Sequence, residues 1–125
     1  MQLHHIAIIC SDEKSLAFYK LLGFEEVNRI MRPEHHDEIV WMKAHGATLE
    51  LFIDNSHPER LTNPEANGLR HLAFSVGGVD AVVAMREALQ DYEPEPIQQD
   101  SFTGEKLFFV KDPDGLPVEI RERMI

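Results

Sequence analysis

Hydrophobic and polar residues alternate along several short stretches of the chain, which is the pattern of strands that are buried on one face. In two further stretches the apolar residues recur at the three- and four-residue spacing of an amphipathic helix. Ser11 is the expected N-cap of the first helix, and Gly23 is its expected stop. The pattern predicts strands at about 3–10, 24–31, 38–44, 47–53, 69–76, 105–111 and 117–122, and helices at about 12–22 and 79–91.

The predicted elements form a repeat. A strand, a helix and three strands occur on each side of a linker at about 54–68, although the second strand of the later half, before residue 105, is weak. The matching pieces are His5-Ile6-Ala7-Ile8 with His71-Leu72-Ala73-Phe74, and Gly46 to Glu50 with Gly115 to Glu119. We therefore predict one α+β domain over residues 1–125, made of tandem βαβββ modules at about 1–54 and 69–125.

Strand alternation places a histidine and a glutamate of each module on the less bulky face of its strands. His5 and His71 share their faces with alanine, whereas the opposite faces of these strands carry isoleucine, leucine and phenylalanine. Glu50 and Glu119 lie within apolar strands, where a covered carboxylate needs a partner. The less bulky faces leave room for a cavity that both residue types would line.

For any one of these four residues, a structural histidine or a solvent-facing glutamate is the simpler interpretation. Their match in repeat position and in strand phase favours a shared metal ion instead. Two imidazoles and two carboxylates suit a divalent metal such as Zn, Ni, Co or Mn, with further positions open to water or substrate.

The excess of acidic residues limits the kinds of molecule that this protein is expected to bind. Lys and Arg number 12 and Asp and Glu number 22, a net charge of −10, which disfavours nucleic acids and anionic membranes. No apolar run approaches the roughly 18 residues of a membrane span, and no signal peptide is visible before the first strand. The single cysteine, Cys10, excludes an internal disulfide and a four-cysteine zinc site. We expect a cytoplasmic protein whose partner is a small molecule.

Three segments carry a family resemblance that covers essentially the whole chain. They are His-His-Ile-Ala-Ile at 4–8, Gly-Leu-Arg-His-Leu-Ala-Phe at 68–74 and Asp-Pro-Asp-Gly-Leu-Pro-Val-Glu at 112–119. With them the chain resembles the vicinal oxygen chelate superfamily, close to its glyoxalase I (lactoylglutathione lyase) branch. The resemblance implies open, curved mixed sheets around one divalent metal per site, and a homodimer. The ligands that it implies are His5, Glu50, His71 and Glu119.

The same resemblance implies a metal-dependent lyase or isomerase that acts on a small α-hydroxycarbonyl or hemithioacetal substrate through a metal-stabilised enediolate. Glu119 is the expected base, and Glu50 is its counterpart from the first module. Lys106 is a candidate contact for an anionic substrate, with a solvated lysine at a strand end as the alternative interpretation. The length of the linker at about 54–68 permits a site within one chain or between two, and the resemblance favours sites shared between two chains.

Two departures from the glyoxalase I pattern bear on the thiol partner. Ile9 stands where these enzymes usually have an arginine for a glutathione carboxylate, and Asp54 stands where they tend to have an asparagine. We therefore expect glutathione hemithioacetal to be a poor substrate. The alternatives are an epimerase, a ring-cleaving dioxygenase, a fosfomycin-type thiol transferase or a non-catalytic ligand-binding protein. A second glutamate ligand, Glu50, disfavours the dioxygenase and the transferase, and the intact ligand set favours catalysis.

Overall fold

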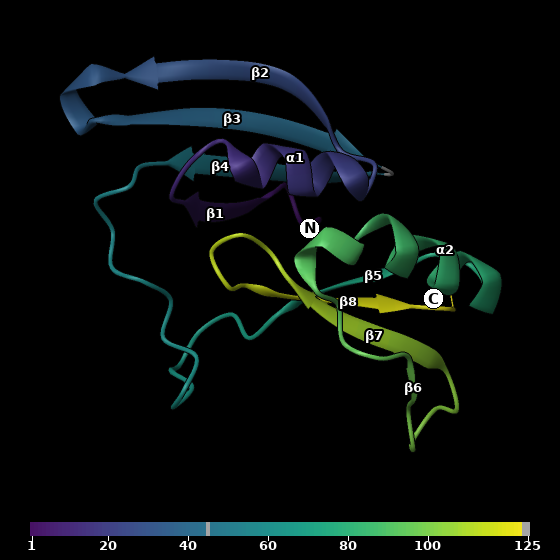
Figure 1. Ribbon diagram of the computed structural model, residues 1–125. Helices are drawn as coiled ribbons and strands as arrows, with labels where there is room; N and C mark the ends of the chain where they lie inside the picture. Colours follow the sequence, from purple (N-terminus) through teal and green to yellow (C-terminus); the bar gives the residue numbers. More distant parts are fainter. Residues whose placement is uncertain (45, 124–125) are drawn as a thin grey trace. The chain divides into compact units, whose positions relative to one another are not determined.

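The computed structural model describes residues 1–44 and 46–123, which divide into two compact units, Met1–Glu59 and Arg60–Ile125 (Figure 1). Each unit is described by itself. The tight turn that the sequence predicts at 45–46 includes His45, which lies outside the described residues.

Unit 1 is an open four-stranded mixed sheet with one α-helix. Its sheet has the order β1-β4-β3-β2, in which β1 runs parallel to β4 and the other neighbours are antiparallel. The elements are β1 (Ile6–Cys10), α1 (Lys14–Leu21), β2 (Glu25–Arg32), the short helix η1 (Pro33–His35), β3 (Asp37–Ala44) and β4 (Ala47–Ile53).

Unit 2 repeats this topology. Its sheet has the order β5-β8-β7-β6, again with a parallel first pair and antiparallel neighbours. The elements are β5 (Leu72–Ser75), α2 (Val79–Ala88), the short helix η2 (Gln90–Tyr92), β6 (Gln98–Gln99), β7 (Lys106–Lys111) and β8 (Pro117–Arg121). The predicted α+β fold of paired βαβββ modules is confirmed, and the weak repeat before residue 105 corresponds to a strand of only two residues.

The predicted start of the first helix is wrong, and its predicted stop is confirmed. The helix begins at Lys14 with Glu13 at the N-cap position, two residues later than predicted, so Ser11 is not the N-cap. Gly23 ends it with a φ of +98°, which glycine adopts at little cost. Its N–H donates to the carbonyl of Lys20 at 2.9 Å, which satisfies one of the last helical acceptors.

The buried core of each unit fixes the phase of its strands. In unit 2 the strand residues Phe108, Val118 and Ile120 are almost fully buried, and α2 contacts β7 and β8 through its buried Val82. Each such side chain contributes roughly 1.5–3 kcal/mol when buried. The buried side chains of unit 1 that share this role are Ile8, Cys10, Val40, Met42, Leu49 and Leu51. Because strand side chains alternate, this core directs both glutamates to the other face of their sheets.

Candidate metal centre

In unit 1 a histidine and a glutamate meet across the parallel strand pair. His5 lies directly before β1, and its Nε2 is 3.1 Å from Oε2 of Glu50 in β4. The register explains the contact, because Glu50 pairs with Ala7, which lies two residues beyond His5 and on the same face. Glu50 is 8% exposed, so His5 supplies a partner to a carboxylate that is almost fully removed from water.

Unit 2 repeats this pair. Nε2 of His71, directly before β5, lies 3.2 Å from Oε2 of Glu119 in β8. Glu119 pairs with Ala73 and is 5% exposed, so the register and the burial match those of the first pair. The sequence predicted a His–Glu pair in each module, and within each unit the structure brings the two residues together.

An aromatic ring completes each pair, and the sequence analysis missed both rings. Trp41 in β3 pairs with Glu50, and its ring centre is 5.1 Å from that of His5 at an interplanar angle of 76°. Phe109 in β7 pairs with Glu119, and its ring centre is 5.4 Å from that of His71 at 83°. The signal was present in the sequence, since each aromatic residue faces its glutamate across the hairpin that ends in the repeated glycine motif.

The donor atoms fit a divalent metal. An imidazole nitrogen and a carboxylate oxygen are ligands of Zn and of the neighbouring transition metals at about 2.0–2.2 Å. Two such ligands at the angles of a tetrahedral or octahedral site lie about 3.0–3.4 Å apart, and the Nε2–Oε2 distances of 3.1 and 3.2 Å agree with that separation. Within each unit, no third His, Cys, Asp or Glu among the described residues joins the pair in a metal-binding group. Within each unit, the described residues thus bring together one imidazole and one carboxylate.

Glu119 has a second partner that the sequence analysis did not identify. Arg121, two residues further along β8, donates from Nη1 to Oε1 of Glu119. Its other nitrogens reach the loop between β6 and β7: Nε donates to Glu105 at 2.9 Å, and Nη2 donates to Asp100 at 2.8 Å and to Thr103 Oγ1 at 3.1 Å. The Asp100, Glu105 and Glu119 carboxylates hold the pKa of Arg121 above its ordinary value, and Arg121 lowers the pKa of Asp100.

The corresponding place in unit 1 is built differently. Phe52 lies two residues beyond Glu50, and the Arg32 guanidinium is 5.2 Å from the centre of its ring. Arg32 donates to both carboxylate oxygens of Asp37, from Nε at 2.8 Å and from Nη2. This pairing raises the pKa of Arg32 and lowers that of Asp37. Glu50 thus makes no hydrogen bond to a guanidinium among the described residues.

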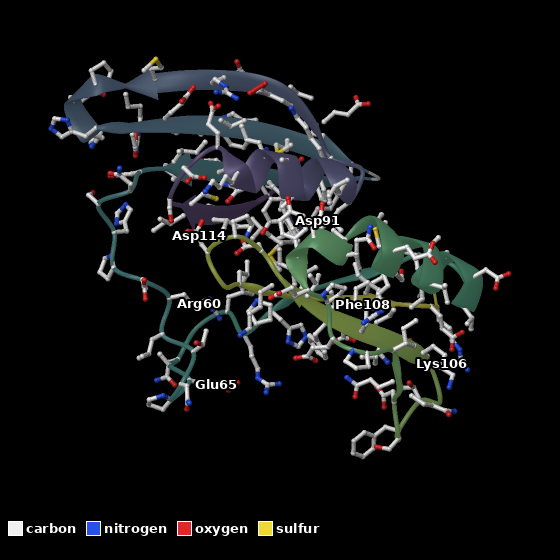
Figure 2. All side chains as sticks on the ribbon, viewed as in Figure 1. Arg60, Glu65, Asp91, Lys106, Phe108 and Asp114 are labelled. Atoms are coloured by element: carbon white, nitrogen blue, oxygen red, sulfur yellow. The ribbon has the colours of Figure 1, made fainter. Side chains whose placement is uncertain are left out.

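Lys106 is not brought to the His71–Glu119 pair. Lys106, which Figure 2 labels, lies three positions before Phe109 in β7, so strand alternation turns its side chain to the opposite face from Phe109. Its Nζ lies 3.4 Å from Oε1 of Gln99. A role for Lys106 in substrate binding stays a prediction, to which the strand register lends no support.

The two positions that depart from the glyoxalase I pattern both lie at the end of the parallel strand pair. Ile9 in β1 is 55% exposed. Asp54 follows β4 directly, and its carboxylate accepts the Ser56 N–H at 2.8 Å, which lowers the pKa of Asp54 and keeps it ionised at neutral pH.

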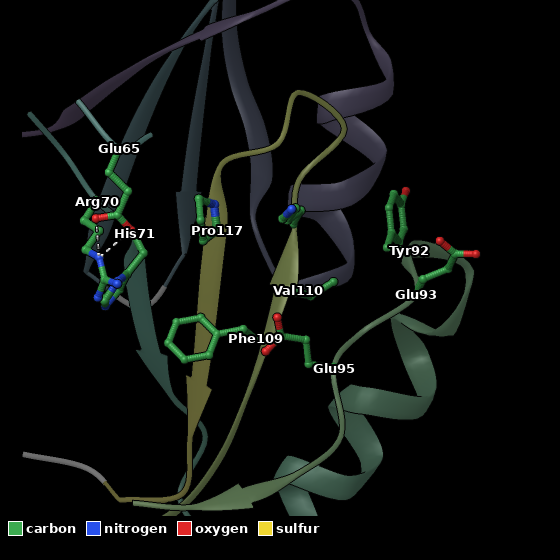
Figure 3. Close-up of a pocket in the computed structure, with 10 residues that line it drawn as sticks. Glu65, Arg70, His71, Tyr92, Glu93, Glu95, Phe109, Val110 and Pro117 are labelled. Carbon is green, nitrogen blue, oxygen red and sulfur yellow. Dashed lines mark hydrogen bonds and ion pairs between the residues drawn. The ribbon is translucent and has the colours of Figure 1, made fainter. Parts of the chain in front are cut away.

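A pocket of about 480 Å³ lies beside His71 within unit 2 (Figure 3). His71 and Phe109 line it together with Arg70, Lys111 and Glu95. This volume is that of a site for a small molecule, and its walls combine apolar surface with both signs of charge. No helix in residues 1–44 and 46–123 is long and apolar enough to span a membrane.

Comparison with known proteins identifies the family. The model of the Glyoxalase/Bleomycin resistance protein/Dioxygenase superfamily matches residues 2–120. Uncharacterized protein YwkD from Bacillus subtilis (strain 168) is 47% identical over 125 residues, which are 97% of this chain and 96% of YwkD. The crystal structure of a glyoxalase family protein from Enterococcus faecalis is 42% identical, covers 97% of either chain and superposes with a TM-score of 0.85.

A more distant structure shares the fold and contains a metal. A mutant of the fosfomycin resistance protein FosX from Listeria monocytogenes, complexed with Mn(II) and 1S,2S-dihydroxypropylphosphonic acid, is 19% identical. The alignment covers 99% of this chain and 94% of FosX, with a TM-score of 0.78. The family match over residues 2–120, the similar proteins and the repeated βαβββ topology agree, and this chain belongs to the Glyoxalase/Bleomycin resistance protein/Dioxygenase superfamily.

Proposed function

We propose that this chain is a metal-dependent lyase or isomerase of the glyoxalase I type, which acts on a small α-hydroxycarbonyl or hemithioacetal substrate. One observation carries the proposal: the same His–Glu pair occurs in both units, with Nε2–Oε2 distances of 3.1 and 3.2 Å. The metal would be of the Zn, Ni, Co or Mn class, and its Mn-containing relative FosX supports the use of a divalent ion. The ligands would be His5, Glu50, His71 and Glu119.

A bound divalent metal would supply Lewis-acid polarisation of adjacent substrate oxygens, which makes the neighbouring C–H group more acidic. In our proposal the Glu119 carboxylate takes that proton from the hydroxyl-bearing carbon and returns it to the adjacent carbonyl carbon, while the hydroxyl proton moves to the former carbonyl oxygen, so that substrate and product are isomers. Glu50 is the counterpart of Glu119 from the other module. The aromatic rings of Trp41 and Phe109 pack edge-to-face against the two histidines and restrict the orientations of their imidazoles.

The assembly proposed for this activity is a homodimer. One unit offers only one imidazole and one carboxylate, so a site with all four ligands joins a unit of each kind. In our proposal the two pairs of one site come from different chains. The pocket beside His71 supports a small molecule as the substrate.

Metal analysis of protein purified without a chelator tests the first half of this proposal. We expect about one equivalent of divalent metal per chain, as one ion held by four ligands requires, and a sharp loss of metal in His5→Ala and in His71→Ala. His35→Ala is the matched control, because His35 is exposed and its one ion pair within the described part of the chain is with Glu34, at 4.0 Å. Full metal content in both of the first two variants would show that the ligand assignment is wrong.

An assay with several thiol–methylglyoxal adducts tests the second half. Isomerisation of at least one adduct by the metal-loaded protein, absent from His71→Ala, is the expected result. A protein that binds metal and turns over none of the adducts would favour another metalloenzyme of the superfamily or a ligand-binding role.

A further inference from the structure

The guanidinium of Arg121 joins the Glu119 carboxylate to the loop between β6 and β7. Nη1 engages Oε1 of Glu119, whereas Nε and Nη2 bind Glu105 and Asp100 at 2.9 and 2.8 Å. The Arg121 side chain is 22% exposed and that of Glu119 is 7% exposed, so this ion pair is largely removed from water. A guanidinium that is bound by several carboxylates adopts few side-chain conformations. It therefore also restricts the conformations of each carboxylate that it binds.

The loop end of this network is itself well fixed. Oδ1 of Asp100 accepts the backbone N–H groups of Phe102 at 2.8 Å and Thr103 at 3.3 Å. The Asp100 backbone also bonds the loop at both ends, since its N–H donates to Glu105 and its carbonyl accepts from Gly104, both at 2.8 Å. The Asp100 carboxylate that binds Arg121 is thus itself held by backbone hydrogen bonds of the loop.

The two glutamates differ as a result. Both oxygens of Glu119 have partners, Oε1 with Arg121 and Oε2 with His71. Among the described residues, the one ion pair of Glu50 is that between its Oε2 and His5, and Phe52 stands where Arg121 stands in the other module. The Glu119 carboxylate is therefore held at both oxygens, and the Glu50 carboxylate is held at one.

We propose that Arg121 is a positioning residue, which ties Oε1 of Glu119 to the 100–105 loop and thereby leaves Oε2 as the one oxygen that can bind the metal and, in the proposed reaction, exchange the substrate proton. The inference rests on the proposed metal site. Hydrogen bonds from surrounding residues orient ligating carboxylates, and their loss typically lowers metal affinity about 10- to 100-fold.

A second effect of Arg121 has the opposite sign, and the two are separable. A positive charge beside the site repels a cation, so removing that charge alone would tighten metal binding. Lysine keeps the charge but not the planar fork that reaches Glu119, Asp100 and Glu105 together. Positioning therefore predicts weaker binding in both Arg121→Gln and Arg121→Lys, whereas simple repulsion predicts tighter binding in the first and little change in the second.

The test is a titration of the full-length protein with Co²⁺ alone, followed by calorimetry and by the visible absorption of the bound ion. We expect about a 10- to 100-fold loss of Co²⁺ affinity and a changed absorption spectrum in Arg121→Gln and Arg121→Lys. Asp100→Asn, which removes an anchor of Arg121 without touching Glu119, should give a smaller loss in the same direction and keeps the test open if an Arg121 variant fails to fold.

Arg29→Gln is the matched control. Arg29 also binds three carboxylates, those of Glu13, Glu26 and Glu38, but it pairs with Val40 and so lies on the opposite sheet face from Glu50. It should lower thermal stability without changing the Co²⁺ affinity or spectrum. Unchanged or tighter Co²⁺ binding in the Arg121 variants would overturn the positioning role alone, whereas a wild-type protein that binds no Co²⁺ would overturn the proposed metal site and this inference with it.

Discussion

Phe52 and Arg121 occupy equivalent positions in the two repeats, each two residues beyond the glutamate of its unit. Phe52 carries the Arg32 guanidinium over its ring at 5.2 Å, and Arg32 is itself paired with Asp37. Arg121 instead places its own guanidinium on the neighbouring carboxylate. Both units therefore contain the His–Glu pair, but only in unit 2 does an arginine among the described residues also bind the glutamate.

This difference predicts unequal costs for removing the two carboxylates. Glu50→Ala and Glu119→Ala should both lower metal content. The loss of metal affinity should be about tenfold larger in Glu119→Ala, because the Glu119 side chain is already fixed and loses less conformational entropy when it binds the metal. Metal titration of both variants, with Glu34→Ala as an exposed control, measures the ratio. Equal affinities would mean that the contact with Arg121 adds nothing to ligation.

We predict that glutathione hemithioacetal is a poor substrate. Exposed Ile9 offers no hydrogen bond to a carboxylate, and the ionised Asp54 at the end of the adjacent strand repels one. The double change Ile9→Arg with Asp54→Asn should therefore raise kcat/KM for this adduct, mainly by lowering KM. Met31→Arg, an exposed apolar position in β2, is the control for added charge. Efficient glutathione turnover by the wild-type protein would contradict the prediction.

The fold and the two His–Glu pairs were predictable because they depend on strict alternation. A buried strand with one polar position, such as Leu49-Glu50-Leu51, has only one phase that buries the leucines, and that phase also directs Glu50 away from the core. The helix start was mispredicted because Ser11, Asp12 and Glu13 follow one another, and the local path of the backbone, which places Glu13 at the N-cap, decides where the first helical turn begins.

The contact between Arg121 and Glu119, and the loop that holds Arg121, were not predictable in the same way. Arg121 binds Glu105 and Asp100, which are 16 and 21 residues away in the sequence, and their approach depends on the path of an irregular loop. The aromatic partners are an intermediate case. Trp41 and Phe109 follow from the hairpin register once the turn lengths are known, but no local pattern marks them.

The ion pair between Arg32 and Asp37 predicts a specific loss of stability in acid. Because Arg32 lowers the pKa of Asp37 below its unperturbed value of about 3.9, the pair stabilises the fold above about pH 4 and loses that effect as pH falls through the lowered pKa. In urea unfolding, Asp37→Asn should be less stable than wild type at pH 7, and the difference should shrink below about pH 4. A difference that stays constant down to pH 2 would contradict the role of this pair.

Asp80→Asn is the control for the acid experiment. Asp80 is exposed in the first turn of α2 and makes no ion pair among the residues that the structure describes. Its replacement should leave the pH dependence of unfolding close to that of wild type.

The last prediction concerns which chains supply the two pairs of one site. If sites are shared between subunits, His5 and Glu50 of one chain act with His71 and Glu119 of the other. The test mixes inactive His5→Ala and Glu119→Ala chains and lets them exchange by partial unfolding and refolding. In the resulting heterodimer one site contains both substitutions and the other contains neither. That heterodimer should recover about half of the wild-type metal content, since one of its two sites is intact.

A second mixture provides the control for this complementation. His5→Ala and Glu50→Ala both alter the first module, so each shared site of their heterodimer carries one defect, and no recovery is expected under either arrangement. Recovery of metal and activity in the first mixture and not in the second would therefore establish shared sites. Absence of recovery in the first mixture, with heterodimers demonstrated by mass spectrometry, would assign each complete site to a single chain, because only then does every site in the mixed dimer retain a defect.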